Sequence, residues 1–322
     1  MTIREPFEAL RDALQPSDRI LITGASGWMG RSLLHELRLA DPEAFPDRVL
    51  ALGSHARQID LLDGSSVAVQ EWHDDVAADW QPTIAVHLAY LTAERITDSS
   101  PEAYAETNAS LTERGLRLQS LPSLRAFMFA SSGAATVAGA DSPLGRHPYS
   151  AQKAQDEDRY LQAGRDHGVP TLAARIWSVS GPYCTKPREY AFSDMIMQAR
   201  TSGSITVTAA GRVVRRYVDA GEFLAACLAA NLNGVSGDLD SAGALVEMRE
   251  LAAAIASELG ATVTATPPDP DLPANIYAAD PDDMDRLATD LRIQFTDLPG
   301  QIRRTADQHR SAPISTDSGP VE

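Results

Sequence analysis

Short apolar runs alternate with longer segments of helical periodicity through the first 180 residues. The runs predict strands at residues 19–23, 48–52, 66–70, 83–90, 125–130 and 169–177. Helical periodicity follows the first run and recurs at residues 101–120 and 149–167, while residues 74–80 form an acidic linker or a short helix. Strands that alternate with helices at this spacing predict an α/β fold with a Rossmann-like, doubly wound parallel sheet.

The same pattern divides the chain into four parts. Residues 1–18 predict a short N-terminal helical extension, and residues 19–180 hold the main sheet. Beyond Gly181 the pattern loosens, and a strand at 204–207 with helices at 222–231 and 247–259 predicts a smaller lobe over 181–304, interleaved with the last elements of the sheet. Residues 305–322 are polar and rich in Ser, Asp and Pro, which predicts a disordered tail.

Composition narrows the class of protein. Apolar residues make up 43% of 322, enough for a full core, and the net charge of −16 argues against a nucleic-acid or anionic-membrane partner. Two cysteines, Cys184 and Cys227, are too few for a disulfide framework. There is no apolar run of about 18 residues and no secretory signal, so we expect a cytoplasmic protein without a membrane span. No metal site is predicted.

A glycine motif joins the first strand to the first long helix. It reads Gly24-Ala25-Ser26-Gly27-Trp28-Met29-Gly30. Gly24 allows a tight turn, Gly27 lets the backbone approach a pyrophosphate, and Gly30 lets the helix pack close to the strand. Free N–H groups at the helix start attract an anion. The motif therefore predicts a dinucleotide site, although an ordinary strand-to-helix turn would also carry glycine.

The end of the second strand indicates which dinucleotide is bound. NAD-binding folds usually place an acidic residue there for the ribose 2′-hydroxyl, but this chain has Gly53 and Ser54, followed by Arg57. A hydroxyl and a guanidinium suit a 2′-phosphate. The sequence favours NADP over NAD, with the alternative that Arg57 only caps a surface turn.

Two later segments carry candidate chemistry. Ser131, Ser132 and Gly133 follow the strand at 125–130, at the edge where such sheets bind ligands. Tyr149 and Lys153 are four residues apart and share one helix face. An ammonium near a phenol favours the phenolate, so the pair could exchange a proton with an alcohol or ketone. By itself, YxxxK could equally be a surface pair.

Together these segments resemble the extended short-chain dehydrogenase/reductase family, in its sugar-nucleotide epimerase/dehydratase/reductase branch. The resemblance covers roughly residues 18 to 300 and adds His87-Leu88-Ala89, Asn108, Arg175 and Gly211-x-x-x-Arg215-x-Tyr217 to the motifs above. It implies that Leu88 and Ala89 line the cofactor site. It also implies a homodimer through the helices that carry Asn108 and Tyr149.

The resemblance implies a role for each matched residue. Tyr149 is the general acid/base, Lys153 lowers its pKa and holds the nicotinamide ribose, and Ser132 binds the substrate oxygen. Asn108 belongs to the proton-relay region. Arg215 binds a substrate phosphate, and Ser178 takes the place of an asparagine that is usual in the family.

Departures from the family pattern decide between reactions. Gly133 and Ala134 replace the Asp-Glu of the 4,6-dehydratases, so elimination of water has no evident catalyst. The sequence favours an NAD(P)-dependent oxidoreductase that reduces a ketone, or oxidises the matching alcohol, of a sugar or sugar nucleotide. The alternatives are an epimerase that uses the same residues and a non-catalytic dinucleotide sensor.

Overall fold

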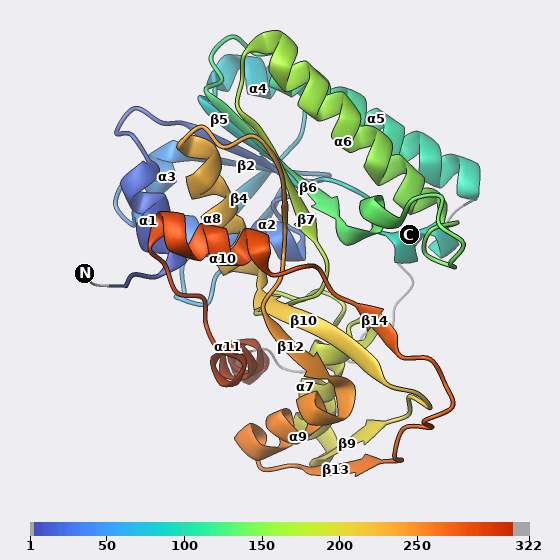
Figure 1. Ribbon diagram of the computed structural model, residues 1–322. Coiled ribbons are helices and arrows are strands. Elements are labelled where there is room, and N and C mark those ends of the chain that lie inside the picture. Colours follow the sequence, from blue (N-terminus) through green and yellow to red (C-terminus); the bar gives the residue numbers. More distant parts are fainter. Residues whose placement is uncertain (1–2, 99, 312–322) are drawn as a thin grey trace.

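The computed structural model describes residues 3–98 and 100–311, which form two lobes (Figure 1). The larger lobe is built on an eight-stranded sheet in the order β11-β7-β6-β5-β1-β2-β4-β3. Only the pairing of β3 with β4 is antiparallel. The predicted Rossmann-like sheet is confirmed. Its strands are β1 (Ile20–Thr23), β2 (Val49–Gly53), β3 (Arg57–Asp60), β4 (Ser66–Glu71), β5 (Ile84–His87), β6 (Ala126–Ser132), β7 (Thr171–Ile176) and β11 (Gly237–Asp240).

Helices cover both faces of this sheet, which is why its central strands are continuously apolar. In β1, Ile20 and Ile22 pack into the cluster on one face and Leu21 into the cluster on the other. The first face carries α1 (Pro6–Ala13), α2 (Trp28–Ala40), α3 (Phe45–Arg48) and α8 (Ala220–Leu232). The opposite face carries α4 (Asp74–Trp80), α5 (Pro101–Gln119) and α6 (Pro148–His167).

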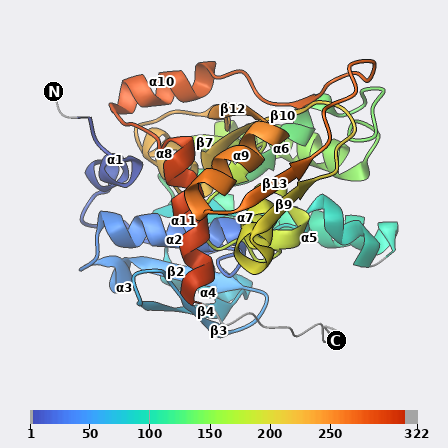
Figure 2. The same ribbon diagram turned by 90° about the horizontal axis from the view of Figure 1, so that it is seen from below.

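The smaller lobe has its own core, between two short sheets and three helices (Figure 2). One sheet holds β8 (Val179–Ser180), β10 (Val213–Asp219), β12 (Ala244–Glu247) and β14 (Asn275–Tyr277), and the other holds β9 (Ser204–Val207) and β13 (Thr262–Ala265). The helices are α7 (Ala191–Ser202), α9 (Met248–Leu259) and α11 (Leu298–Ser311). Between them, α10 (Asp282–Leu291) returns to the larger lobe beside α8. Single 3₁₀ turns lie at η1 (Ala93–Asp98), η2 (Gly133–Val137) and η3 (Pro187–Glu189).

The prediction of a disordered tail over residues 305–322 is wrong for its first seven residues. Residues 305–311 continue α11, and Thr305 is fully buried. Its hydroxyl is satisfied there because it accepts a hydrogen bond from the Gly181 amide at 2.9 Å. A polar composition is compatible with a helix when its buried positions find partners of this kind. The rest of the predicted tail, 312–322, lies outside the described residues.

Two properties of the described part of the chain bear on the class of protein. None of its helices has the length and apolar character needed to cross a membrane. Within the same residues, no group of three or more His, Cys, Asp or Glu side chains is arranged to hold a metal ion.

Candidate active site

The glycine motif forms a tight cradle between β1 and α2. Gly24 has φ +69°, and a Cβ there would lie 2.6 Å from the Ala89 amide nitrogen. A Cβ on Gly30 would lie 2.4 Å from the Gly24 carbonyl oxygen, so α2 can pack this close only with glycine at that position. Gly27 is the N-cap of α2 and offers no side-chain cap to the first N–H groups of the helix. This cradle fits a dinucleotide pyrophosphate.

Arg31 lies near Arg57, in the region that follows the end of β2. The side chain of Arg57 is exposed on β3, the edge strand of the sheet. Burial and the nearby charge of Arg57 lower the pKa of Arg31, which follows the glycine motif. The Arg31 Nε donates to the Ser26 carbonyl at 3.1 Å. Two guanidinium groups therefore share this region, next to Gly53 and Ser54, where an NAD-type acid is absent.

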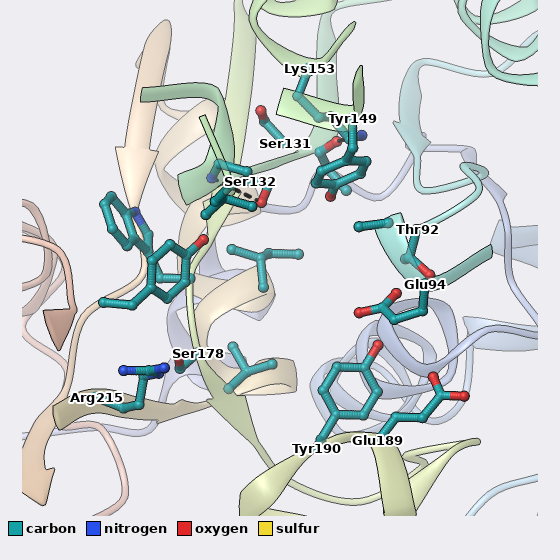
Figure 3. Close-up of a pocket in the computed structure, with 18 of the residues that line it drawn as sticks. Thr92, Glu94, Ser131, Ser132, Tyr149, Lys153, Ser178, Glu189, Tyr190 and Arg215 are labelled. Atoms are coloured by element: carbon teal, nitrogen blue, oxygen red, sulfur yellow. Dashed lines mark hydrogen bonds between the residues drawn. The ribbon is translucent and has the colours of Figure 1, made fainter. Parts of the chain in front are cut away.

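A cavity of about 820 Å³ lies between the lobes, beyond the ends of β5, β6 and β7 (Figure 3). Ser132, Tyr149 and Lys153 lie along one wall, and Glu94, Glu189 and Tyr190 lie across from them. A third side holds Ser178 and Arg215. Trp28, Met29 and Leu88 bring the cofactor cradle to the same cavity. Some of the residues predicted for the cofactor and for the substrate thus border one cavity, although Asn108 and Gly133 do not line it.

Tyr149 is the second residue of α6, two residues after the N-cap His147. The His147 ring accepts a hydrogen bond from the Tyr149 amide at 3.1 Å and fixes where the helix starts. Burial raises the pKa of Tyr149, and a hydrogen bond to Ser132 lowers it. Burial raises the pKa of Tyr277 as well, and Ser132 again lowers it. The Ser132 hydroxyl therefore lies between two phenols, one from each lobe, where a substrate oxygen could meet all three.

Lys153 is buried, and its ammonium does not act on Tyr149 in the way the sequence analysis expected. Its Nζ donates to the Ala130 carbonyl at 2.9 Å and lies 3.3 Å from the centroid of the Tyr90 ring, against 5.9 Å for the Tyr149 ring. Burial lowers the pKa of Lys153 to about 8, opposed by Asp156 and Glu157. The net shift of the Tyr149 pKa is upward, so the phenol carries its proton at neutral pH in this structure.

Three predicted site residues serve the scaffold. Asn108 is fully buried and bonds both backbone groups of Leu91, with its Oδ1 accepting from the amide at 2.8 Å and its Nδ2 donating to the carbonyl at 3.2 Å. It anchors the loop after β5 and does not line the cavity. Gly133 does not line the cavity either. It packs against Trp177 so closely that a Cβ at this position would lie 2.2 Å from the Trp177 ring.

Ser131 is the third. It borders the cavity, but its hydroxyl donates to Glu157 Oε1 at 2.5 Å. Glu157 in turn receives two hydrogen bonds from Arg175. This buried network ties β6 and β7 to α6 behind the site. Substrate binding by the Ser131 hydroxyl would require breaking it.

Arg215 lines the cavity as predicted. It lies on β10, and its Nη1 donates to the Val214 carbonyl at 2.8 Å and to the Asn275 side chain at 3.1 Å. Burial lowers the pKa of Arg215. These contacts hold the guanidinium beside Tyr277 and its neighbour Trp177, whose rings lie 4.7 Å apart.

Sequence reasoning missed the aromatic residues of the site. Tyr90, Trp177, Tyr190 and Tyr277 all line the cavity, and Tyr190 contacts Trp28 edge-on at 5.1 Å between centroids. Tyr90 could have been noticed, because it follows His87-Leu88-Ala89 directly. The other three lie in loops and edge strands whose position depends on how the lobes meet.

Comparison with known proteins identifies the class. The profile of the NAD dependent epimerase/dehydratase family matches residues 20–240, and the chain belongs to this family, as the motifs predicted. A UDP-glucose 4-epimerase from Azospirillum brasilense is 26% identical over 184 residues, 53% of this chain and 52% of the relative. The chain thus spans about half the length of that relative.

Two solved structures share the fold over nearly the whole chain. The UDP-N-acetylglucosamine 4-epimerase of Methanobrevibacter ruminantium superimposes with a TM-score of 0.71 at 18% identity, covering 92% of this chain and 99% of that one. The UDP-glucose 4-epimerase of Thermus thermophilus, in complex with NAD, gives 0.69 at 22% identity, covering 92% and 100%. At this identity the likeness establishes the fold.

Proposed function

We propose that this protein is an NAD(P)-dependent epimerase of a sugar nucleotide. The observation that carries the proposal is the convergence of Ser132, Tyr149 and Tyr277 beside the glycine cradle, in a cavity large enough for a sugar nucleotide. Relatives named as 4-epimerases of UDP-linked sugars favour this activity over the reductase that the sequence analysis preferred.

In the proposed reaction the protein handles the proton and the cofactor handles the hydride. A dinucleotide held by the glycine cradle would supply the hydride acceptor and donor for oxidation of a sugar carbon and its reduction from the opposite face. Tyr149 takes the proton of the sugar hydroxyl and later restores it, and Ser132 donates a hydrogen bond to the same oxygen. Lys153 supplies a buried ammonium on the same wall of the cavity, available to the nicotinamide ribose. Arg215 contributes a cation for the diphosphate.

The arrangement disfavours elimination of water in this proposal. Gly133 and Ala134 follow Ser132, so neither of the two positions after the carbonyl-binding hydroxyl supplies a carboxylate. A net oxidoreductase is the second candidate, since the same three side chains serve one hydride transfer as well as two. A non-catalytic sensor is disfavoured because it would have no use for a buried lysine beside Tyr149.

The proposed cofactor is NADP. Arg31 and Arg57 place two guanidinium groups near Gly53 and Ser54, and a carboxylate that would repel a 2′-phosphate is absent from that turn. Structural relatives with NAD bound support the same cradle for the rest of the dinucleotide. The proposal includes a homodimer through α5 and α6, which light scattering of the purified protein would test.

One experiment separates epimerase from reductase. Purified protein is incubated with UDP-linked hexoses and catalytic NADP⁺ or NAD⁺, and the sugar products are separated while the absorbance of the reduced cofactor is followed. Interconversion of epimers without net cofactor reduction supports the epimerase. Stoichiometric accumulation of reduced cofactor with a keto sugar would contradict it and support the second candidate.

A further inference from the structure

Lysine is almost absent from this chain, and one of its two lysines is buried in the candidate site. The chain carries 28 basic residues, of which only Lys153 and Lys186 are lysines. Arginine stays charged in proteins, whereas a buried lysine changes its pKa readily. Lys153 is 4% exposed. A chain that uses arginine nearly everywhere else thus places a titratable ammonium at this position.

The Tyr90 ring covers this ammonium. Lys153 Nζ lies 3.3 Å from the centroid of the Tyr90 ring, and its one hydrogen bond to a described residue goes to the Ala130 carbonyl. The face of an aromatic ring is negative and attracts a cation, most strongly where water is excluded. The ring of Tyr149 approaches the Tyr90 ring edge-on, with centroids 6.0 Å apart. The Tyr90 ring therefore contacts both the Lys153 ammonium and the ring of Tyr149.

Asp156 faces the other end of Tyr90. It follows Lys153 by three residues on α6, and its Oδ1 accepts from the Thr112 hydroxyl of α5 at 3.0 Å. Its Oδ2 and the Tyr90 hydroxyl are both buried and have no hydrogen-bond partner of ordinary geometry among the described residues. Each nevertheless shifts the pKa of the other, so the two groups are close neighbours. A small rotation of Tyr90 would let its hydroxyl donate to this carboxylate.

The geometry points to Tyr90 as a positioning residue of the proposed reaction, which keeps the Lys153 ammonium charged and in place through its ring face. The effect on chemistry passes through Lys153, because Tyr90 itself offers no group that the proton transfer requires. This inference deepens the proposed function and rests on it for the catalytic consequence only.

The charged and titratable groups that face Lys153 determine whether its ammonium keeps its charge. Asp156 and Glu157 on α6 raise the pKa of Lys153, while burial lowers it to about 8. On β5, the buried ring of His87 has a pKa of about 3, so it is neutral near pH 7. Tyr149 and Tyr90 complete the surroundings, and burial raises the pKa of both phenols, so they are also neutral near pH 7. The ring face of Tyr90 thus assists two carboxylates in keeping the charge.

The test is a titration of Lys153 that needs no substrate. Protein labelled with ¹³C at lysine Cε should give two signals, with Lys186 as an internal reference because it is partly exposed and paired with Glu189 at 2.9 Å. In Tyr90→Leu and Tyr90→Met, which both remove the ring, we expect the Lys153 midpoint to fall by about one pH unit or more. In Tyr90→Phe, which keeps the ring, the midpoint should stay near the wild-type value.

Controls separate positioning from loss of packing. Tyr160→Leu removes another buried tyrosine, whose ring packs on Phe129 with centroids 4.5 Å apart. The Lys153 ammonium lies over the Tyr90 ring instead, so the Lys153 midpoint should stay unchanged in this variant. An unchanged midpoint in both ring-less Tyr90 variants would overturn the inference. If the wild-type protein turns over no sugar nucleotide, the proposed function fails while the titration still decides the role of Tyr90.

Discussion

Arg304 Nη2 lies 2.9 Å from Glu36 Oε1, and this contact joins α11 to α2. Glu36 is 2% exposed. The same guanidinium also contacts Glu222 and, at 3.4 Å, Asp219, so one cation serves three buried carboxyl groups. Burial raises the pKa of Glu36 to about 8 and that of Glu222 to about 7, against the attraction of Arg304.

This cluster predicts that stability falls as the pH rises from about 4.5 to about 8. In that window the folded protein holds protons that the unfolded chain has released, so each group lowers the free energy of unfolding by up to about 1.4 kcal/mol per pH unit. Glu36→Gln should flatten this dependence in denaturant unfolding. Glu258→Gln, at a partly exposed pair with Arg303, should leave it unchanged. An undiminished slope in Glu36→Gln would contradict the assignment.

Tyr149→Phe should abolish most turnover and leave cofactor binding intact. The phenol oxygen is the only atom removed, and general acid/base catalysis contributes on the order of 10²–10⁴-fold. Initial rates with a turned-over sugar nucleotide and fluorescence titration with NADPH measure the two properties. Tyr160→Phe loses a buried hydroxyl that donates to the Thr112 carbonyl at 3.1 Å, outside the cavity, and is the control. A rate equal to wild type in Tyr149→Phe would remove this residue from the mechanism.

Arg31→Gln and Arg57→Gln should each weaken NADPH binding by about 10-fold or more, with little effect on NADH. A charged hydrogen bond to phosphate contributes about 1.5–3 kcal/mol. NADH lacks the 2′-phosphate, so it makes no such bond and loses nothing when the arginine is replaced. Competitive titration of the two cofactors gives the ratio. Arg286→Gln, at an exposed pair with Asp283, controls for the change in net charge. Tighter binding of NADH than NADPH by the wild-type protein would refute the NADP preference.

Asn108→Ala should cost stability rather than chemistry. Its amide bonds the amide and carbonyl of Leu91, and leaving buried backbone groups unpaired costs about 1–3 kcal/mol. Turnover per folded molecule should change by about tenfold or less. Asn108 does not line the cavity, and its loss reaches the site only through Tyr90, which precedes the anchored Leu91. Asn231→Ala, which removes a similar buried bond to the Val235 carbonyl at 3.0 Å, should match its loss of stability. A loss of about 10²-fold or more at full folding would instead indicate proton relay.

The sequence alone predicted six of the eight strands of the main sheet and the glycine cradle, but it missed β3 (Arg57–Asp60) and β11 (Gly237–Asp240). Runs such as 19–23 are apolar on both faces because helices cover both, and periodicity records this burial directly. Gly24 and Gly30 were predictable because their requirement is local: a positive φ at one and a close helix–strand approach at the other. Tyr149 and Lys153 were found for the same reason, since four residues of helix place them on one face.

Only the tertiary structure decided what surrounds these residues. Tyr277 reaches Ser132 from a strand far along the chain, Arg304 returns across most of the chain to Glu36, and Asn108 turns to the backbone of a loop instead of the cavity. The direction of the pKa shift of Tyr149 also depended on burial, which outweighs the hydrogen bond to Ser132. Sequence spacing fixes neighbours along one element, whereas contacts between elements and their desolvation follow from how the two lobes pack.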